Sequence, residues 1–318
     1  MKRLFPLIFA LLALVFFTGC GENASSKKLR MGVCIPVATH GWAGGVVWHA
    51  NETKKKLEKA NPDLEVIITA AENPADQADK IENLLARNVR SLVVMSQEPG
   101  PITGVCEKAV KAGKHLVIVS NPLSRKVEDI FVNGDNKSFG AAAAECMGKL
   151  LKGKGSILVM EGTPCPINSD RVNSFKAVLA KKYPNIKILD SKPAFWNTEK
   201  GLELMENFLQ KYPKVDGVWA GDDDVMKGAL KAYQESKRKD VKVFVGGGGA
   251  KEVVKLIKDD KSLVKGTVTY SPGMIAKGME EALALMRSGK KGRKEILIPS
   301  HVVTKENAAK YYFPASVY

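Results

Sequence analysis

The chain of 318 residues has few of the residues that build metal sites or nucleophilic catalytic sites: four histidines and five cysteines. No two cysteines form a C-x-x-C pair, and the histidines lie at no ligand spacing near them, so we expect no metal and no cofactor. Apart from Cys20, the cysteines are Cys34, Cys106, Cys146 and Cys165, three of them in apolar periodic segments. Buried free thiols fit this pattern, and a disulfide stays open as the alternative.

Acidic residues are also scarce: 34 Asp and Glu stand against 49 Lys and Arg, a formal net charge of +15. Such an excess can indicate binding to nucleic acid or to an anionic membrane surface. The lysines are scattered over several segments, and no helix-turn-helix or RNA-binding motif is present. We therefore predict no nucleic-acid partner and interpret the charge as a solvated surface near a membrane.

Long apolar runs are missing as well, except for one near the N-terminus. Two basic residues precede the run from Leu4 to Phe17, and the sequence FTGC ends at Cys20. This pattern is typical of a secretory signal peptide, here residues 1–20. Its end resembles a lipobox, so Cys20 is the predicted lipidation site and residues 21–28 a tether. The prediction is a membrane-anchored lipoprotein in the periplasm or at the cell surface. An uncleaved membrane anchor is the alternative, for which the run is short.

The rest of the chain alternates short apolar runs with helix-patterned segments. Strands separated by single helices indicate an α/β fold with parallel sheets and helices on both faces. About eleven strands are too many for one sheet around one core, so two lobes of similar plan are predicted. The predicted strands span residues 29–35, 64–70, 91–96, 115–119, 130–133, 156–160, 186–190, 215–220, 241–246, 263–269 and 296–303.

Three turns in the second half of the chain carry polar or aromatic groups directly after a predicted strand. Asn168 and Arg171 follow the first of these strands, Trp196 the second and Asp222 the third. In an open α/β sheet, ligands bind outside the carboxyl ends of the strands. These turns are therefore predicted to form half of a cleft for a small hydroxylated molecule, and the chain before Asn133 would supply the other half.

Four stretches carry a family resemblance when they are taken together and in order: AENPADQADKIENLLARNVRSLVVM, PCPINSDRVNSF, AFWNTEKGLELMENFLQKYPKVDGVWAGDDDVMKGAL and TVTYSPGMIAKG. With them, the chain from about Leu29 to Val303 resembles the type I periplasmic sugar-binding proteins that bind ribose, glucose or galactose, and xylose.

The resemblance implies two Rossmann-like lobes joined by a hinge of three crossings. The N-terminal lobe would comprise residues 29–134 and 271–297, and the C-terminal lobe residues 135–270 and 298–318. It also implies a monomer without catalytic activity that binds a monosaccharide or polyol between the lobes. The closed form would deliver this ligand to the transmembrane subunits of an ABC permease.

By the same resemblance, eight residues are candidates for contact with the ligand. An indole at a strand-to-helix turn can pack on the C–H face of a sugar, and a guanidinium can hold two of its oxygens. The residues alone leave alternatives open: Trp42 packs inward, Arg171 lies on the surface, and Tyr270 lines only the hinge. The candidates are His40, Trp42, Asn121, Asn168, Arg171, Trp196, Asp222 and Tyr270, with Ser96 and Gln97 as weaker ones.

Neighbouring residues of the same types have other interpretations. Trp48 and Trp219 lie inside periodic elements and are predicted to be core residues. Asp223 and Asp224 stand at a predicted helix start, where carboxylates cap the helix and favour its dipole, and Asp222 could share that role.

The chain also departs from the family pattern. Gly246 to Gly249 stand where relatives have a carboxylate, and Pro122 stands where ribose-binding members have an arginine, which argues against ribose and glucose. The glycines would leave room for a bulkier group or let backbone N–H groups contact the ligand. The run fits neither a P-loop nor G-x-G-x-x-G spacing, so a phosphate site is disfavoured.

Three other classes of protein are alternatives to a sugar-binding protein. An enzyme would need a histidine at a catalytic loop, and His40 is the one good candidate, with Cys165 on the opposite lobe. The effector domain of a transcription regulator would carry a DNA-binding helix pair where this chain has its apolar leader. A receptor for a nucleoside- or autoinducer-type ligand stays open, because two tryptophans could sandwich a flat ring.

Overall fold

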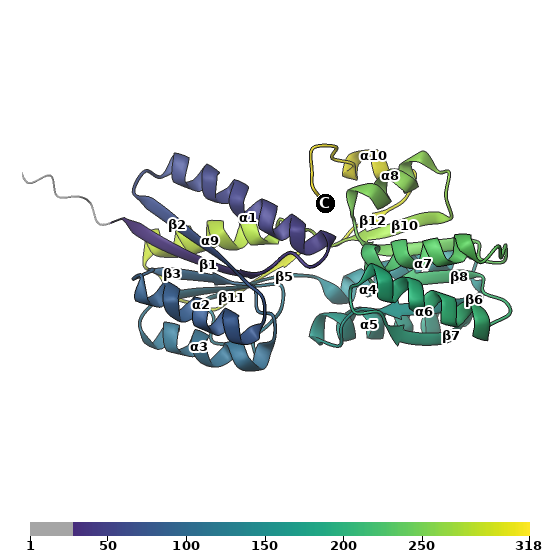
Figure 1. The fold of residues 1–318 in the computed structure, drawn as a ribbon, viewed down its shortest axis with the longest axis horizontal. Coiled ribbons are helices and arrows are strands. Elements are labelled where there is room, and N and C mark those ends of the chain that lie inside the picture. The colour runs from purple at the N-terminus through teal and green to yellow at the C-terminus, as the bar shows by residue number, and fades with distance from the viewer. Residues whose placement is uncertain (1–27) are drawn as a thin grey trace, which may run out of the picture.

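The computed structural model describes residues 28–318, which form two α/β lobes lying end to end (Figure 1). The predicted signal peptide, the lipidation site Cys20 and most of the tether fall outside the described residues. The first lobe contains β1 (Leu29–Pro36), α1 (Gly41–Ala60), β2 (Leu64–Ala71), α2 (Pro74–Ala86), β3 (Ser91–Val94), α3 (Pro99–Lys111), β4 (His115–Val119), β5 (Ile130–Gly134), α9 (Met274–Ser288) and β11 (Lys294–Ile298).

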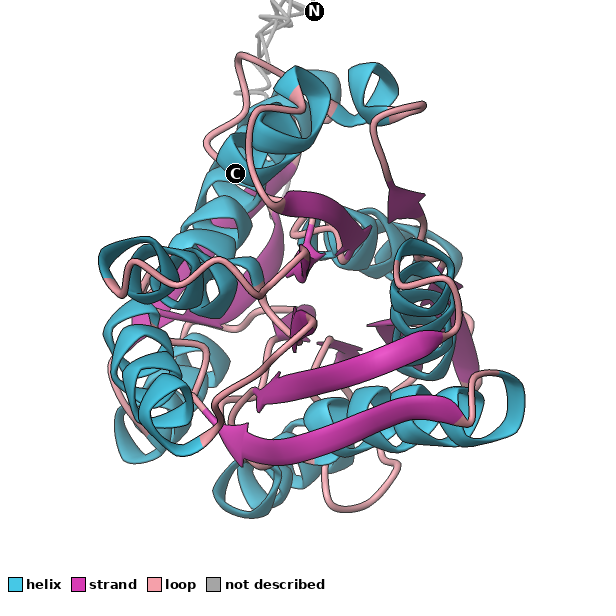
Figure 2. Cartoon of the chain, turned by 90° about the vertical axis from the view of Figure 1, so that its right-hand side faces the viewer, coloured by secondary structure: helices cyan, strands magenta, loops and turns pink. Residues whose placement is uncertain are grey.

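The second lobe is built on the same plan from the middle and the end of the chain. It contains α4 (Asn136–Leu150), β6 (Lys154–Glu161), α5 (Pro166–Lys182), β7 (Asn185–Pro193), α6 (Thr198–Lys211), β8 (Gly217–Ala220), α7 (Asp223–Glu235), β9 (Val243–Gly248), α8 (Lys251–Asp259), β10 (Val264–Thr269), β12 (Val302–Val303) and α10 (Ala308–Tyr311). Figure 2 looks onto this lobe and shows helices on both sides of its strands.

Each lobe has one six-stranded sheet, in the order β11-β5-β4-β3-β1-β2 in the first and β12-β10-β9-β8-β6-β7 in the second. The central strands β3 and β4 are buried at every residue, as expected for parallel strands covered on both faces. The α/β prediction with two Rossmann-like lobes is therefore confirmed. All pairings in the first sheet are parallel, so the carboxyl ends of its strands meet at one edge.

Several helices begin at capping residues that the sequence presents locally. Asn73 precedes Pro74 and accepts a hydrogen bond from the N–H of Asp76, and Asp135 accepts one from the N–H of Ser138 at the start of α4. Such caps satisfy N–H groups that the first turn of a helix leaves free. They fix where these helices begin, and so where the loops that follow the strands lie.

The chain passes between the lobes three times. The passages lie between β5 and α4, between β10 and α9, and between β11 and β12. The prediction of one final strand over residues 296–303 is wrong, because the chain there divides into two strands of different sheets. Pro299 follows β11 and lacks the N–H that a continuing strand would use, and β12 then pairs antiparallel to β10.

Trp219 and Trp48 have opposite environments. Trp219 is wholly buried in the second lobe and stacks on Phe175 with 3.8 Å between the ring centroids, which confirms the core prediction. The same prediction is wrong for Trp48, whose side chain is 37% exposed on α1 beside His49. Periodicity assigns a residue to a helix but does not show which part of the helix a neighbouring element covers.

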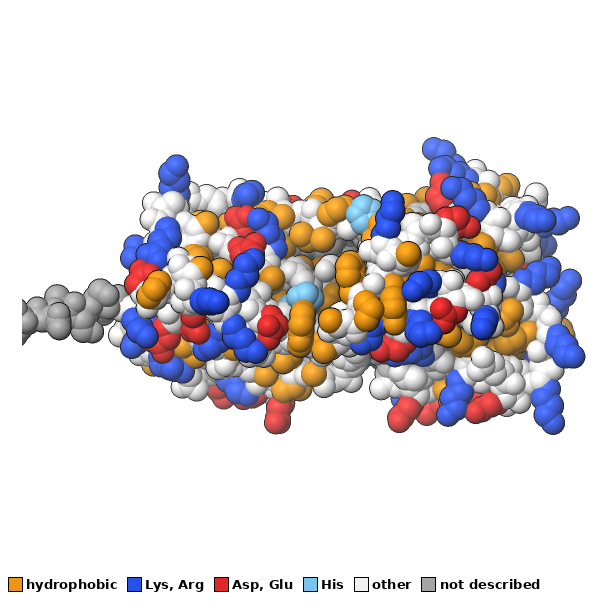
Figure 3. Space-filling view, turned by 90° about the horizontal axis from the view of Figure 1, so that it is seen from above, with side chains coloured by type: hydrophobic (Ala, Val, Ile, Leu, Met, Phe, Trp, Pro, Cys, Tyr) orange, Lys and Arg blue, Asp and Glu red, His pale blue; other side chains and the backbone are white. Residues whose placement is uncertain are grey.

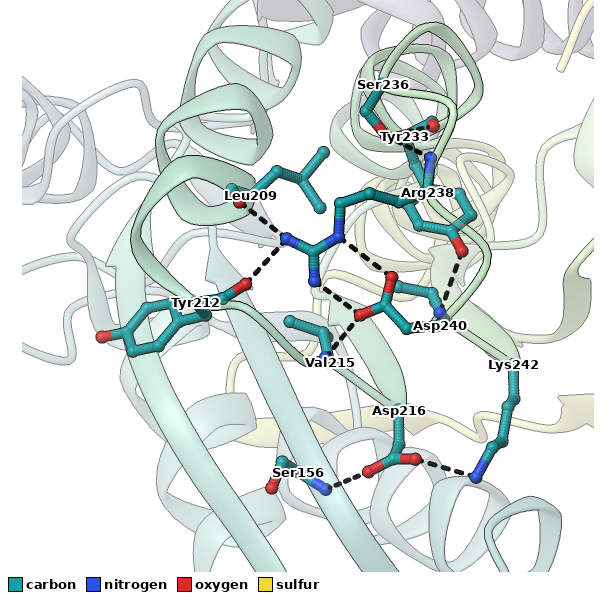
Figure 4. Close-up of polar contacts among 11 residues, drawn as sticks. Ser156, Leu209, Tyr212, Val215, Asp216, Tyr233, Ser236, Arg238, Asp240 and Lys242 are labelled. Atoms are coloured by element: carbon teal, nitrogen blue, oxygen red, sulfur yellow. Dashed lines mark hydrogen bonds and ion pairs between the residues drawn. The ribbon is translucent and has the colours of Figure 1, made fainter.

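A polar cluster holds the loops at the amino ends of the strands in the second lobe (Figure 4). Arg238 forms a bidentate pair with Asp240 and donates to the carbonyl oxygens of Leu209 and Tyr212 at 2.6 and 2.7 Å. Asp240 in turn accepts from the N–H of Val215 at 2.7 Å. This arginine joins the ends of α6 and α7 at the edge of the sheet where the strands begin.

The surface carries basic side chains on both lobes rather than in one patch on the face seen in Figure 3. Among residues 28–318, no helix is long and apolar enough to cross a membrane. The four cysteines in this part of the chain are free thiols, three of them buried, as the sequence pattern favoured. Burial raises the pKa of Cys106 to about 12, so this thiol is protonated at neutral pH.

Candidate functional site

A cavity of about 290 Å³ lies between the lobes, at the carboxyl ends of strands from both sheets. Seven of the eight candidate residues line it: His40, Trp42, Asn121, Arg171, Trp196, Asp222 and Tyr270. Asn168 does not. Its side chain is buried in the β6–α5 turn, where it accepts from the N–H of Gly162 at 2.8 Å and donates to Glu161 at 3.2 Å. The structure therefore brings together seven residues spread over 231 positions of the chain, from 40 to 270.

Trp42 reaches the cavity from the first turn of α1. Its side chain is 8% exposed, and its Nε1–H donates to the carbonyl oxygen of Tyr270 at 2.7 Å. The His40 and Tyr270 rings lie beside it, with centroids 6.4 and 5.4 Å away. Burial lowers the pKa of His40, so its imidazole is neutral at pH 7. His40 and Trp42 of the first lobe, together with Tyr270, thus present an uncharged aromatic surface to the cavity.

Polar side chains of the first lobe line the same cavity. Asn121 donates through Nδ2 to the carbonyl oxygens of Ser96 and Gln97, at 3.1 and 3.2 Å. Asn121 Oδ1, Ser96 Oγ and Gln97 Oε1 are buried without a hydrogen-bond partner among the described residues. A buried acceptor without a partner is costly, about 1–3 kcal/mol. Three such atoms at the wall of one cavity indicate a guest that donates hydrogen bonds.

Arg171 brings a positive charge to the second-lobe side of the cavity. It is 5% exposed, and it donates through Nε to Asn136 at 2.9 Å and through Nη1 to the carbonyl oxygen of Gly221 at 3.0 Å. Its guanidinium carbon lies 4.0 Å from the centroid of the Phe139 ring and 4.3 Å from that of Tyr270. Burial lowers its pKa, although a guanidinium stays charged at neutral pH.

One nitrogen of this guanidinium, Nη2, is free to donate to a ligand as far as the described residues are concerned. Nη2 makes no hydrogen bond to another described residue, while stacking against rings restrains the plane of the group. Arg171 can therefore donate to an oxygen of a bound molecule without giving up its own contacts.

Trp196 lies on the opposite wall from Trp42, in the turn that follows β7. Phe195 and Trp196 both have φ of +58°, a left-handed conformation that non-glycine residues adopt at a cost of about 1–2 kcal/mol each. A methyl group placed on Gly162 would lie 1.8 Å from the indole, so only glycine admits the ring there. The turn thus stores strain in order to hold the indole over the cavity.

The three adjacent aspartates have three different roles, which their positions in the sequence do not separate. Asp222 lines the cavity and also caps α7, because its Oδ1 accepts from the N–H groups of Asp224 and Val225 at 2.8 and 3.2 Å. Asp224 accepts from the N–H of Gly41 in the other lobe at 2.9 Å and pairs with Lys227 at 2.7 Å. The expectation that Asp223 and Asp224 cap the helix is wrong, since Asp222 makes the cap, but both stand in the first turn of α7, where a carboxylate favours the helix dipole.

Asp223 is wholly buried and organises the glycine run. It accepts from the N–H groups of Gly249 and Ala250, at 2.9 and 2.8 Å, and from Thr267 Oγ1 at 2.8 Å. Burial raises its pKa to about 6, although these hydrogen bonds act to lower it. The amide N–H groups of Gly249 and Ala250 are therefore already occupied and are not available to a ligand.

The expectation that the glycine run leaves room for a bulkier ligand is wrong at three positions, because other side chains occupy the space. A methyl group on Gly246 would lie 2.1 Å from Asp223 Oδ1, one on Gly247 2.5 Å from Phe139 Cζ, and one on Gly248 2.0 Å from the Tyr318 oxygen. Gly247 and Gly248 still line the cavity. The sequence alone did not identify Phe139 and Tyr318, which fill the space beside the glycines, or Asn136, which accepts from Arg171, because they stand in the first turn of α4 and at the chain end rather than directly after a strand.

Burial of Asp222 leads to a pH-dependent stability. Burial, followed by the charges of Asp224 and Asp223, raises the pKa of Asp222 to about 8, against about 3.9 for an unfolded aspartate. Between these values the folded chain holds a proton that the unfolded chain has released. The stabilising contribution is therefore complete below about pH 4 and is lost as the pH rises through about 8.

Asp222→Asn should remove this dependence, because the amide is neutral at every pH and its oxygen can still cap α7. The free energy of unfolding of the parent protein is expected to fall by about 2 kcal/mol more than that of the variant between about pH 6 and 8. Urea unfolding of both proteins at the two pH values measures this difference. Equal losses in the two proteins would show that Asp222 is ionised throughout this range.

No group of three or more His, Cys, Asp or Glu in residues 28–318 is arranged to hold a metal ion. The cavity wall instead combines aromatic rings, a guanidinium and neutral acceptors contributed by two lobes. This combination defines a two-lobe binding protein that encloses a small polar molecule.

The chain belongs to the periplasmic binding protein family, because the model of the periplasmic binding protein domain matches residues 31–291. It is a binding protein and not an enzyme, and membership of this family indicates an extracytoplasmic location.

Relatives of known function and known structure agree with this assignment. The chain is 30% identical over 258 residues to the ribose import binding protein RbsB of Bacillus subtilis, covering 80% of this chain and 82% of that protein. It is 28% identical over 269 residues to the xylitol-binding protein of Mycolicibacterium smegmatis, covering 81% and 74%. A solute-binding protein of Bacillus halodurans solved with myo-inositol has the same fold, with a TM-score of 0.81, 22% identity and 91% and 99% of the two chains covered.

Proposed function

We propose that this protein binds a small sugar or polyol in the cavity between its lobes and serves as the substrate-binding component of an ABC importer. The observation that carries the proposal is that the two walls of the cavity offer different hydrogen-bonding groups. The second lobe offers the free donor of Arg171 within a set of aromatic rings, and the first lobe offers acceptors that lack partners.

The chemistry of a polyhydroxylated guest matches both walls. Its C–H groups can pack against the indoles of Trp42 and Trp196, and its hydroxyl groups can donate to Asn121, Ser96 and Gln97. Arg171 can donate to a hydroxyl or ring oxygen. The cavity, about 290 Å³, is at the small end of the range for ligand sites, which favours a single sugar unit or a polyol.

The relatives support this class of ligand without selecting one member. Their names describe binding of ribose, xylitol and D-apiose, and related structures contain D-allose, myo-inositol and glycerol. Pro122 and the glycine run argue against ribose itself. A pentitol, a branched or epimeric sugar, or an inositol is therefore preferred to D-ribose.

Binding would be coupled to closure of the two lobes about the three passages between them. We propose that the first lobe comprises residues 29–134 and 271–297 and the second residues 135–270 and 298–318. A ligand favours the closed form only through contacts that the open form lacks, and the cavity supplies these from both lobes. The closed monomer would then dock on the transmembrane subunits of the permease, with Cys20 as a lipid anchor holding the protein at the membrane.

A thermal-shift screen tests the function. The panel contains D-ribose, D-allose, D-apiose, xylitol, myo-inositol and glycerol, with nucleosides as the alternative class. A ligand present at about 100 times its dissociation constant should stabilise the native state by about 2.7 kcal/mol and so raise the melting temperature. A shift with nucleosides alone would contradict the sugar and polyol assignment.

Trp196→Ala should weaken binding of the strongest ligand of this panel about 10- to 100-fold, because the variant loses the stacking surface of the second lobe. Isothermal titration measures the affinity, and circular dichroism checks the fold. Trp48→Ala is the matched control, because this indole is exposed on α1 outside the cavity. Similar affinities for the two variants would place the ligand away from Trp196.

A further inference from the structure

The end of the chain lies between the two lobes, although it is attached to the second. Lys251 of α8 donates through Nζ to the carbonyl oxygen of Ser316, and the N–H of Tyr318 donates to Ser316 Oγ at 3.1 Å. In Figure 1 the C mark lies between α1 of the first lobe and α8 of the second. The segment from Phe313 to Tyr318 is therefore carried by the second lobe and faces the first.

Tyr318 fills a slot that glycines of both lobes leave open. A methyl group on Gly45 of α1 would lie 3.0 Å from Tyr318 Cβ, and one on Gly41 would lie 3.4 Å from Tyr318 Cδ2. On the other side, a methyl group on Gly248 would lie 2.0 Å from the phenol oxygen, and Gly248 has φ of +128°. The side chain of Tyr318 is only 9% exposed, so the slot encloses it almost completely.

The same end of α1 meets two other groups at the boundary between the lobes. The N–H of Gly41 donates to Asp224 Oδ2 of the second lobe at 2.9 Å. A methyl group on Gly45 would also lie 2.9 Å from Cγ of Pro272, in the passage between β10 and α9. The first two turns of α1 are thus one part of the first lobe against which the second lobe seats, and they also carry Trp42.

We infer that Tyr318 is a positioning residue for closure: its ring, seated against the glycine face of α1, holds the two lobes in the arrangement that places Trp42 opposite Trp196. The inference rests on the proposed function only in that closure serves to enclose a ligand. Tyr318 does not line the ligand cavity. It therefore acts on the ligand through the relative position of the lobes.

The ring of Tyr318, rather than its hydroxyl group, makes the contact. The phenol oxygen is buried without a hydrogen-bond partner among the described residues. Tyr318→Phe should therefore keep the lobes closed, whereas Tyr318→Ala empties the slot and should favour the open form. This pair of variants separates packing from hydrogen bonding.

Adjacent glycines of α1 offer a second, independent pair. Gly45→Ala places a methyl group against Tyr318 and Pro272, whereas Gly44→Ala meets nothing within 4 Å. Both substitutions favour the helix itself, since alanine is the better helix former. A difference between the two variants therefore reports the seating of the second lobe on α1 and not the folding of α1.

The experiment is hydrogen exchange of the full chain without ligand, followed by mass spectrometry of the peptide that contains Gly41 and its bonded N–H. The amide hydrogens of this peptide should exchange several-fold faster in Gly45→Ala and Tyr318→Ala than in the parent protein. In Gly44→Ala and Tyr318→Phe they should exchange at the parental rate. Unfolding midpoints should show that all four variants fold. Equal exchange in Gly45→Ala and Gly44→Ala, or parental exchange in Tyr318→Ala, would overturn the inference.

Titration with xylitol, D-allose and myo-inositol then connects closure to binding. Gly45→Ala and Tyr318→Ala should bind whichever of these three compounds the parent binds about tenfold more weakly, because part of the binding energy must now close the lobes. Saturation with that compound should return the exchange to the parental rate, which a merely structural defect would not allow. If no sugar or polyol of the thermal-shift panel binds the parent, the proposed function fails, while the exchange results still decide the inference.

Discussion

Arg171→Ala is expected to lower the affinity for the strongest sugar or polyol ligand by about 100-fold or more, with little change in the fold. A hydrogen bond from a charged donor contributes about 1.5–3 kcal/mol, and about 2.8 kcal/mol corresponds to a hundredfold change. The substitution also removes the guanidinium that lies 4.0 and 4.3 Å from the centroids of Phe139 and Tyr270, so Tyr270, which lines the cavity, loses a packing partner. Isothermal titration measures the effect.

Arg171→Lys tests the geometry rather than the charge. Lysine keeps the positive charge but cannot donate to both Asn136 and Gly221 and at the same time place a planar group over the Phe139 ring. We therefore expect it to recover only a small part of the lost affinity. Full recovery by lysine would show that the site uses Arg171 as a point charge.

Arg238 provides the matched control, because it is the arginine of the second lobe with a structural network of its own (Figure 4). Arg238→Ala leaves Asp240 and the carbonyl oxygens of Leu209 and Tyr212 without their donor. It should therefore lower the free energy of unfolding by about 2–3 kcal/mol while the affinity stays within about twofold. If both arginine variants lost affinity equally, the loss would reflect general destabilisation and not contact with the ligand.

Gly140→Ala is expected to destabilise the second lobe strongly, by about 3 kcal/mol. Gly140 lies in α4 where that helix crosses α5, and a methyl group there would lie 2.0 Å from the carbonyl oxygen of Arg171. A backbone atom cannot rotate out of the way, so α5 must move as a whole. Because α5 carries Arg171, the affinity should fall together with the stability.

Gly104→Ala is the control for this prediction, since Gly104 is a glycine inside α3 with nothing within 4 Å of the added methyl group. Alanine in an exposed helix position stabilises by up to about 1 kcal/mol relative to glycine. Urea unfolding should therefore give changes of opposite sign for the two variants. If Gly140→Ala left the free energy of unfolding unchanged, α4 and α5 would be able to move apart without an energetic cost.

Much of the fold could be predicted because buried strands and helix caps have recognisable local sequence patterns. The strands β3 and β4 appear as continuous apolar runs, and helices such as α2 and α6 begin at capping residues that stand directly before them. The boundary of the last strand could not be predicted. Whether residues 296–303 continue in one sheet or cross to the other depends on partners far away in the chain, β5 and β10.

The candidate site, too, could be predicted only in part. Trp42 and Trp196 follow predicted strands, so their approach to a shared cavity could be expected from the α/β plan together with the family resemblance. The roles of the three aspartates could not, because adjacent identical residues differ only in what surrounds them. Asp223 turns to the glycine run and Asp224 to the opposite lobe, and neither partner is near in sequence.

The amino-acid sequence by itself determined the alternation of strands and helices, the division into two lobes, and the residues that follow the strands into the cleft. These are consequences of local periodicity, capping and turn chemistry, which act over a few residues. Only the tertiary structure decided that Phe139 and Tyr270 flank Arg171 and that Tyr318 occupies a slot of glycines on α1. The physical reason is that close packing depends on distances between segments that are not neighbours in the sequence, and no local pattern encodes those distances.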